Sequence, residues 1–350
     1  MTTRNTEFLD RVRPDSNVDM HVHMVSLVED DGNYVSKQLA SGVVYQYLLR
    51  NLGLANRSDR ERELHYVNLL KLCAIEDGGP DLMVLLALDW VYDDAGERDK
   101  RRSHLVIAND TVFRVCREHP EFIPAASVNP RRKDALEELD RVAELGAVML
   151  KILPNLQGFD PGDPAFRPFW RRLAEHGIPL LSHTGYEHAL PSINDSFGDP
   201  RRLVPALEEG CTVVAAHCAA AGTFHKVEYF DTFVGMLPRY PRLYGDISGF
   251  ASPIRRSYVE PMLTSTLRRQ RVLVGSDFPI PCLPMAFLKE LGLRRARELS
   301  GDPNPLRRNI NLFRALGVDD EVFQRAAKVI LGIDDTSQSE PRPRSRRLRS

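Results

Sequence analysis

The stretch Ile178-Pro179-Leu180-Leu181-Ser182-His183 and its counterpart Thr212-Val213-Val214-Ala215-Ala216-His217 decide how this chain folds. Each is a short apolar run that ends in a histidine, and the two histidines are 34 positions apart. One strand with its crossover helix takes roughly 30 residues. Apolar runs without alternation are typical of parallel strands covered on both faces. The two stretches therefore predict consecutive strands of a parallel sheet.

The same arrangement recurs along most of the sequence. From Lys151 onward, the polar residues that end the runs lie at positions 151, 183, 217, 246 and 277, in steps of 32, 34, 29 and 31. The eight predicted strands span residues 18–20, 82–88, 122–128, 147–150, 178–182, 212–216, 243–245 and 272–276. Eight such repeats predict an α/β protein with a closed (β/α)8, or TIM, barrel. An open doubly wound sheet is the alternative, but no Gly-x-Gly-x-x-Gly or phosphate-binding loop follows any run.

The segments between the runs have the pattern of helices. Residues 131–145 place apolar side chains along one helical face, and Gly146 follows them as a left-handed cap. A long insert, residues 24–80, separates the first two strands, and it contains two predicted helices at 35–52 and 58–75. We expect this insert to lie over the barrel mouth or beside it.

The C-terminal part of the chain lies outside the eight repeats. Residues 303–331 predict two extra helices. We therefore expect one barrel domain over residues 1–334, followed by a tail at 335–350 that is rich in arginine, serine and proline. Such a composition cannot bury a core, so the tail is expected to be disordered.

Composition limits the classes of partner. The net charge is −1, which gives no overall attraction to nucleic acid. No apolar run approaches the roughly 18 residues of a membrane span. The five cysteines are scattered and form no Cys-x-x-Cys pair, which predicts reduced thiols and a cytoplasmic location. The expected partner is a small-molecule substrate, and a homo-oligomer is compatible with the sequence.

Polar side chains at the ends of the runs are the candidate site. The first run continues into His21 and His23, which point the same way because residues i and i+2 share one face of a strand. In a (β/α)8 barrel the carboxyl ends of all strands meet at one rim, where active sites lie. Imidazole and carboxylate groups are good ligands for zinc and similar divalent ions. The rim would bring together His21, His23, Lys151, His183, His217 and Asp277.

These residues resemble the metal-dependent amidohydrolase superfamily, and within it the amidohydrolase-related branch, also called amidohydrolase 2. The shared pattern is His-x-His on strand one, Lys on four, His on five and six, and Asp on eight. Residues 150–159 (LKILPNLQGF) and 275–279 (GSDFP) are similar to that branch's strand-four and strand-eight signatures. The resemblance covers residues 18–331, although the insert 24–80 carries no motif that we can place.

The resemblance implies a role for each candidate. His21, His23 and His183 would hold the metal together with Asp277, which would also act as the general base and acid. His217 would either ligate a metal or polarise the substrate oxygen. From the residues alone, each histidine could instead be a buried side chain with polar partners, and Asp277 a structural carboxylate.

Lys151 has three interpretations. It closes an apolar strand, where an unpaired ammonium would be costly. It could be carboxylated and bridge two metals, as in binuclear members of the superfamily. It could stay cationic and bind a substrate carboxylate, or it could pair with a carboxylate such as Asp246.

Three further residues are candidates for contact with substrate: Asp246, Asn155 and Trp90. A structural hydrogen bond for Asp246 and ordinary packing for Trp90 are the alternatives. His188 and His225 follow ligand-bearing strands and could also reach the pocket.

The function that the sequence predicts is a metal-dependent hydrolase of a small-molecule amide, ester or lactone, with metal-activated water and Asp277 as base and acid. The cofactor would be one or two divalent ions, zinc first, with manganese, iron or cobalt as alternatives. The rival is a metal-dependent non-oxidative decarboxylase of an aromatic or muconate-like acid. A non-enzymatic metal-binding protein is a third class, and retention of every candidate ligand argues against it.

Overall fold

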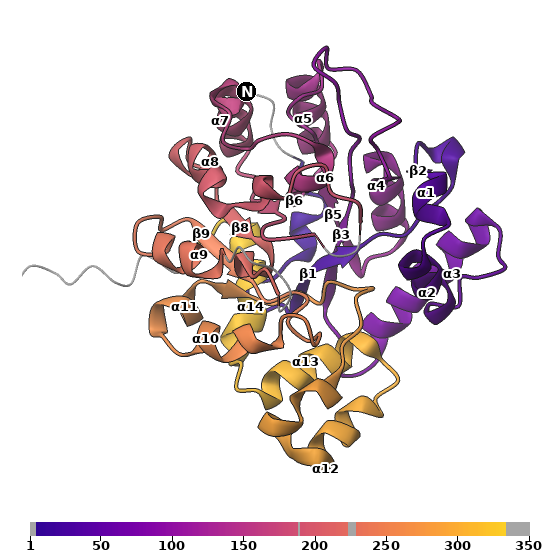
Figure 1. The fold of residues 1–350 in the computed structure, drawn as a ribbon, viewed down its shortest axis with the longest axis vertical. Coiled ribbons are helices and arrows are strands. Elements are labelled where there is room, and N and C mark those ends of the chain that lie inside the picture. The colour runs from indigo at the N-terminus through magenta and orange to yellow at the C-terminus, as the bar shows by residue number, and fades with distance from the viewer. Residues whose placement is uncertain (1–4, 188–189, 223–228, 334–350) are drawn as a thin grey trace, which may run out of the picture.

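A computed structural model describes residues 5–187, 190–222 and 229–333, in which eight parallel strands form a barrel (Figure 1). Neighbouring strands follow the order β1-β3-β5-β6-β7-β8-β9-β10, so each strand pairs with the next one of the repeat. The strands are β1 (Val18–His23), β3 (Leu82–Leu86), β5 (Phe122–Ala126), β6 (Met149–Ile152), β7 (Leu180–Ser182), β8 (Val213–Ala215), β9 (Leu243–Asp246) and β10 (Val272–Leu273). The predicted fold class and all eight predicted strands are confirmed, with ends shifted by a few residues.

The barrel closes between its first strand and the segment that follows its last one. Val22 forms a parallel bridge with Phe278. The His23 amide donates to the Phe278 carbonyl at 2.9 Å, and the Asp277 amide donates to the His21 carbonyl at 2.9 Å. This closure places both histidines of β1 beside Asp277, although 254 positions separate His23 from Asp277.

Helices surround the strands, as Figure 1 shows. They are α4 (Asn109–Glu118), α5 (Ala135–Glu144), α6 (Pro154–Gln157), α7 (Arg167–Glu175), α8 (Val204–Glu208), α9 (Phe230–Met236), α10 (Val259–Leu263) and α11 (Thr266–Gln270). The helix predicted at 131–145 is α5, which buries Leu139, Val142 and Ala143 against the barrel. Gly146 follows it with a φ of +91°, as its predicted role as a left-handed cap requires.

The insert after β1 differs from its prediction. The single helix predicted at 35–52 is wrong, because the segment divides into β2 (Tyr34–Val35), α1 (Lys37–Ala40) and α2 (Val43–Asn51). Gly42 causes the break, since it is extended (φ −69°, ψ 139°) and starts α2 as its N-cap. The other predicted helix is α3 (Asp59–Ile75), which begins with a capping box.

A small second sheet was not predicted. It pairs β2 with β4 (Leu105–Val106) in antiparallel orientation. Two residues per strand are too few for an alternating pattern to be recognised in the sequence.

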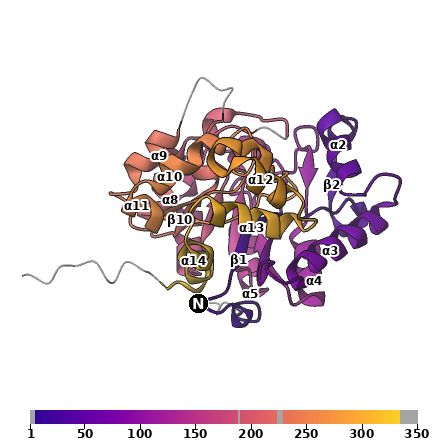
Figure 2. The ribbon, with the colours of Figure 1, turned by 90° about the horizontal axis from the view of Figure 1, so that it is seen from below.

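Three helices follow the barrel: α12 (Leu288–Ser300), α13 (Pro305–Ala315) and α14 (Asp320–Leu331). The two helices predicted at 303–331 are confirmed, and α12 is additional. α14 packs against β1 and β10 (Figure 2). Its Arg325 donates from Nη1 to the Arg269 and Val272 carbonyls, both at 2.7 Å. α14 therefore covers the seam where the barrel closes.

The predicted disordered tail and the predicted domain limit stay predictions. The tail at 335–350 and the domain limit at residue 334 lie outside the described residues. Among the helices that the structure describes, none is long and apolar enough to cross a membrane.

Gly275 is required by the seam, and its replacement is a first testable prediction. A Cβ atom at position 275 would lie 2.6 Å from the His21 Cβ. Gly275→Ala is therefore expected to lower the free energy of unfolding by about 1–3 kcal/mol, because the backbone of one segment must shift. Gly235→Ala, within α9, is the control, since its added methyl group meets nothing within 4 Å. Denaturant unfolding should leave the control unchanged or stabilised by about 0.5–1 kcal/mol.

Candidate metal centre at the barrel rim

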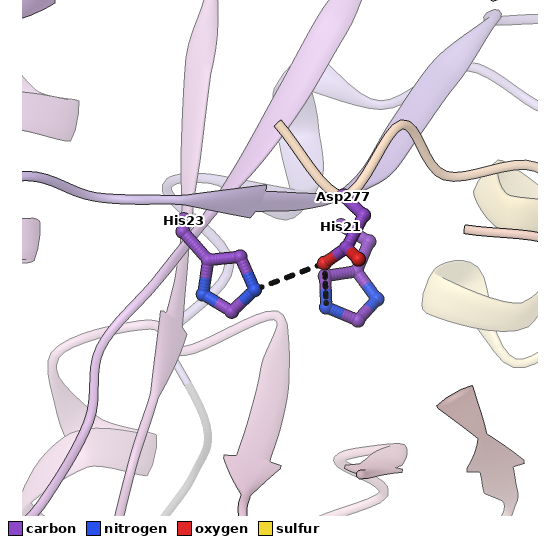
Figure 3. A group of neighbouring side chains, drawn as sticks. All are labelled: His21, His23 and Asp277. Carbon is purple, nitrogen blue, oxygen red and sulfur yellow. Dashed lines mark hydrogen bonds and ion pairs between the residues drawn. The ribbon is translucent and has the colours of Figure 1, made fainter. Parts of the chain in front are cut away.

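Three predicted ligands lie together at the carboxyl ends of the first and last strands (Figure 3). His23 Nε2 is 3.1 Å from Asp277 Oδ1, and His21 Nε2 is 3.4 Å from the same oxygen. One ligand atom from each residue lies within 4.8 Å of the other two. His21 and Asp277 are buried, whereas the His23 side chain is 35% exposed.

Asp246 fixes the ring of His21. Its Oδ2 accepts a hydrogen bond from His21 Nδ1 at 2.8 Å, so the lone pair of Nε2 points toward the other ligands. Metal-bound histidines usually donate their second ring nitrogen to a carboxylate in this way. Burial alone would raise the pKa of the fully buried Asp246 carboxyl, but His21, His217 and the hydrogen bond from Ser248 together keep the pKa below its usual range. These contacts agree with a structural hydrogen-bonding role for Asp246, which was the alternative to contact with substrate.

His217 is held in one tautomer. Its Nδ1 lies 2.9 Å from the Ser248 carbonyl oxygen, which can only accept, so Nδ1 carries the proton and Nε2 is bare. Burial, together with the charge of Arg255, holds the pKa of His217 well below its usual range. A neutral imidazole with a bare Nε2 is suited to bind a metal ion rather than to donate a hydrogen bond to substrate.

The backbone at two candidate residues has an unusual conformation. His217 has a φ of +58° and Asp277 a φ of +62°. Residues other than glycine rarely adopt this left-handed region, and such strain concentrates at functional sites. The Asp246 carboxylate stabilises the conformation of His217, because its Oδ1 accepts a hydrogen bond from the His217 amide at 2.7 Å.

His183 is buried, and its Nε2 has no hydrogen-bond partner among the described residues. The nearest carboxylate oxygen in an ion-pair geometry is Glu187 Oε2, at 3.6 Å. Burial and the neighbouring Lys151 hold the pKa of His183 well below its usual range, so the ring is neutral. Its ring centroid is 5.1 Å from that of His217, and His183 is not part of the group formed by His21, His23 and Asp277.

Lys151 lies inside β6 with 1% of its surface exposed. Its Nζ is 3.1 Å from His21 Nε2. In the part of the chain that the structure describes, Lys151 forms no ion pair within 4.0 Å, so a direct pair with Asp246 is not seen. Burial lowers the pKa of the ammonium group to about 8.

These donors fit a divalent ion of the zinc type. Two atoms bound about 2.1 Å from one ion lie about 3.0–3.4 Å apart at tetrahedral or octahedral angles. The separations of 3.1 and 3.4 Å around Asp277 Oδ1 match that range. Nε2 of His183 is a further nitrogen available to an ion, because it is buried and has no hydrogen-bond partner among the described residues. An unpaired buried polar atom is costly, and binding an ion would remove that cost.

The structure gives the contacts of two other predicted site residues. Asn155 is fully buried and donates to the Gly185 carbonyl at 3.0 Å, while its Oδ1 has no partner among the described residues. Trp90 is half-buried and stacks on Tyr34, with ring centroids 5.1 Å apart. Contact of either residue with substrate stays a prediction. His188 and His225 lie outside the described residues.

Arg255 was missed by the sequence analysis. It is 6% exposed, and it donates to the Ala220 and Tyr186 carbonyls, both at 3.2 Å. Its Nη1 and Asp277 Oδ2 both approach Gly249, where a Cβ atom would lie 3.2 and 3.0 Å from them. A single arginine in a loop nine positions beyond β9 has no periodic signal, so only the fold reveals that it faces Asp277.

Comparison with known proteins agrees with this geometry. The model of the amidohydrolase family matches residues 18–309. A TIM-barrel protein from Bordetella bronchiseptica is 19% identical with a TM-score of 0.53, covering 86% of this chain and 99% of that one. A provisionally assigned 2-pyrone-4,6-dicarboxylic acid hydrolase from Pseudomonas putida is 15% identical with a TM-score of 0.52, covering 91% and 97%.

A 5-carboxyvanillate decarboxylase from Sphingomonas paucimobilis is 15% identical with a TM-score of 0.53, covering 91% and 98% of the two chains. At these identities the likeness shows the fold alone. No curated protein sequence matches this chain. Because the family model covers most of the chain and its motifs fall on the strands that carry them, the protein belongs to the amidohydrolase family, in its amidohydrolase 2 branch.

Proposed function

We propose that this protein is a metal-dependent hydrolase of a small-molecule amide, ester or lactone. The observation that carries the proposal is the position of Asp277, whose Oδ1 lies 3.1 Å from His23 Nε2 and 3.4 Å from His21 Nε2. Burial alone would raise the pKa of its carboxyl, but the hydrogen bond from His23 and the nearby positive charges keep the pKa below its usual range. The carboxylate is therefore ionised at neutral pH and can accept a proton from water.

The rival reaction would use Asp277 differently. A decarboxylase delivers a proton to the carbon that loses carbon dioxide, whereas a hydrolase takes a proton from water and returns it to the leaving atom. Lys151 favours hydrolysis, because its buried Nζ lies 3.1 Å from His21 Nε2, where a carboxylated lysine would bridge two ions.

The chain's own residues supply most of the proposed steps. Asp277 accepts a proton from the attacking water, and the C–N or C–O bond of the substrate then breaks as Asp277 returns that proton to the leaving atom. A divalent ion held by His21, His23 and Asp277 would supply Lewis-acid activation of the water and of the carbonyl. His217 acts as a ligand in this scheme, because its Nε2 is bare.

Lys151 gives the second testable prediction, the number of ions. With its pKa lowered to about 8, a sizeable fraction of the side chain is a neutral amine near physiological pH. The amine can add carbon dioxide and lose a proton, which leaves a carboxylate on Nζ. That group would complete a second site with His183 and His217, so we expect about two metal equivalents per chain.

Metal counting by mass spectrometry in bicarbonate buffer tests this. Lys151→Met should retain about one equivalent, held by His21, His23 and Asp277. Lys133→Met is the matched control, because Lys133 is exposed and pairs with Glu97 at the surface. One equivalent in the unaltered protein would contradict the bridging role and leave Lys151 as an ammonium group.

The experiment that tests the proposed function is a third prediction. The protein is reconstituted with zinc, manganese or cobalt and offered amides, esters, lactones and aromatic acids, while acid release and carbon dioxide release are both recorded. We expect acid release without carbon dioxide. Carbon dioxide release from an aromatic or muconate-like acid, without hydrolysis of any other compound, would contradict the proposal and establish the decarboxylase.

A further inference from the structure

The backbone ladder is interrupted at the level of the metal ligands. β10 ends at Leu273, and the bridge between Val22 and Phe278 lies five positions farther along. On the other side of β1, the register with β3 is irregular between Asp19 and Val22. The backbone of His21 is therefore paired through contacts outside a regular ladder, and its carbonyl accepts from the Asp277 amide across the seam.

The side chain of Asp19 occupies this interruption. Its Oδ1 accepts a hydrogen bond from the Ser276 amide at 2.9 Å and another from the His21 amide at 3.2 Å. Ser276 immediately precedes Asp277 in the sequence. One carboxylate oxygen thus links the backbone amide of His21 to that of Ser276, the residue before Asp277.

Asp19 makes these contacts in a buried position. It is 7% exposed and lies two positions before His21 in β1. Among the described residues it forms no ion pair within 4.0 Å. A buried carboxylate without a cation is costly, and the hydrogen bonds from the Ser276 and His21 amides offset that cost.

The two segments that Asp19 joins leave no space for adjustment. Gly275 approaches His21 so closely that even a methyl group would overlap it. A metal site tolerates deviations of only about 0.2 Å in its ligand distances. A displacement of one segment along the seam would therefore pull Asp277 away from the two histidines.

We propose that Asp19 is a positioning residue that fixes the separation between the histidines of β1 and Asp277 across the barrel seam. The inference rests on the proposed metal dependence, and it adds a residue that does not touch the ion. Its action depends on where the acceptor oxygen lies, so moving that oxygen should matter more than removing the charge.

Two variants separate position from charge. Asp19→Asn keeps an oxygen in place to accept both amides, whereas Asp19→Glu keeps the charge but displaces the oxygen by one methylene group. We expect Asp19→Glu to weaken zinc binding by about 10–100-fold, as for other residues that orient ligands, and Asp19→Asn to stay within about threefold. Zinc affinity is measured by competition with a chromophoric chelator, and the free energy of unfolding is measured beside it.

Asp81→Ala is the matched control. Asp81 Oδ2 accepts from the Asn17 amide at 2.8 Å, immediately before β1 begins. Losing that bond should change stability without changing zinc affinity.

Zinc affinity in Asp19→Glu equal to that of the unaltered protein would overturn the inference, even if stability fell. A loss in Asp19→Asn as large as in Asp19→Glu would also overturn it, because charge rather than position would then be acting. If the unaltered protein binds no zinc, the proposed function fails as well, and that result is distinct from normal binding that Asp19 does not affect.

Discussion

Asp277→Asn is expected to reduce kcat by about a thousandfold or more while a substantial part of the metal stays bound. General acid and base catalysis contributes about 10²–10⁴-fold, and Asp277 performs both proton transfers in the proposed scheme. The amide oxygen of asparagine can still face the ion, and both histidines of β1 remain. The measurement combines kcat, on the substrate that the screen identifies, with metal content by mass spectrometry.

Asp110→Asn is the control for this prediction. Asp110 is exposed and pairs with Arg141 on the outside of the barrel, so its kcat should not change. Full activity in Asp277→Asn would show that another group moves the proton. A complete loss of metal together with activity would show that Asp277 acts mainly as a ligand.

Removal of the metal should have a comparable effect. Dialysis against a strong chelator is expected to bring turnover down to background, because Asp277 alone cannot activate water or a carbonyl group at neutral pH. Addition of zinc, manganese or cobalt should restore it, whereas magnesium should not, since it prefers all-oxygen sites. Bound metal at about a thousand times its dissociation constant would also stabilise the fold by about 4 kcal/mol.

The metal content of each sample decides how this result is interpreted. Full activity in protein shown by mass spectrometry to be metal-free would contradict a metal-dependent mechanism. Inactive protein that regains its thermal midpoint but not its turnover on adding zinc would place the ion at a structural site instead.

Much of the fold could be predicted because a parallel barrel has a strong signal in sequence. Each strand is buried on both faces, so it appears as a continuous apolar run, and each repeat has a nearly constant length. The spacing from Lys151 to Asp277 therefore predicted that the strands carrying these residues pair in sequence order, and the structure confirms it. The same regularity placed His21, His23 and Asp277 on one rim.

The features that could not be predicted are those without periodicity. Gly42 ends a helical pattern by its conformation, and the two-residue strands β2 and β4 are too short to show alternation. Arg255 and Asp19 act through contacts with residues far away in the sequence, since Asp19 and Ser276 are 257 positions apart. The contact of Lys151 with His21 likewise depends on how β6 and β1, which are not neighbours in the sheet, face each other inside the barrel, and sequence spacing does not determine this.

Anomalous diffraction from crystals of the zinc-loaded protein tests the metal centre most directly. A peak at the zinc edge is expected about 2.0–2.2 Å from His21 Nε2, His23 Nε2 and an oxygen of Asp277. Stoichiometric zinc located elsewhere in the molecule, with these three side chains still bonded to one another, would contradict the metal centre proposed for this protein.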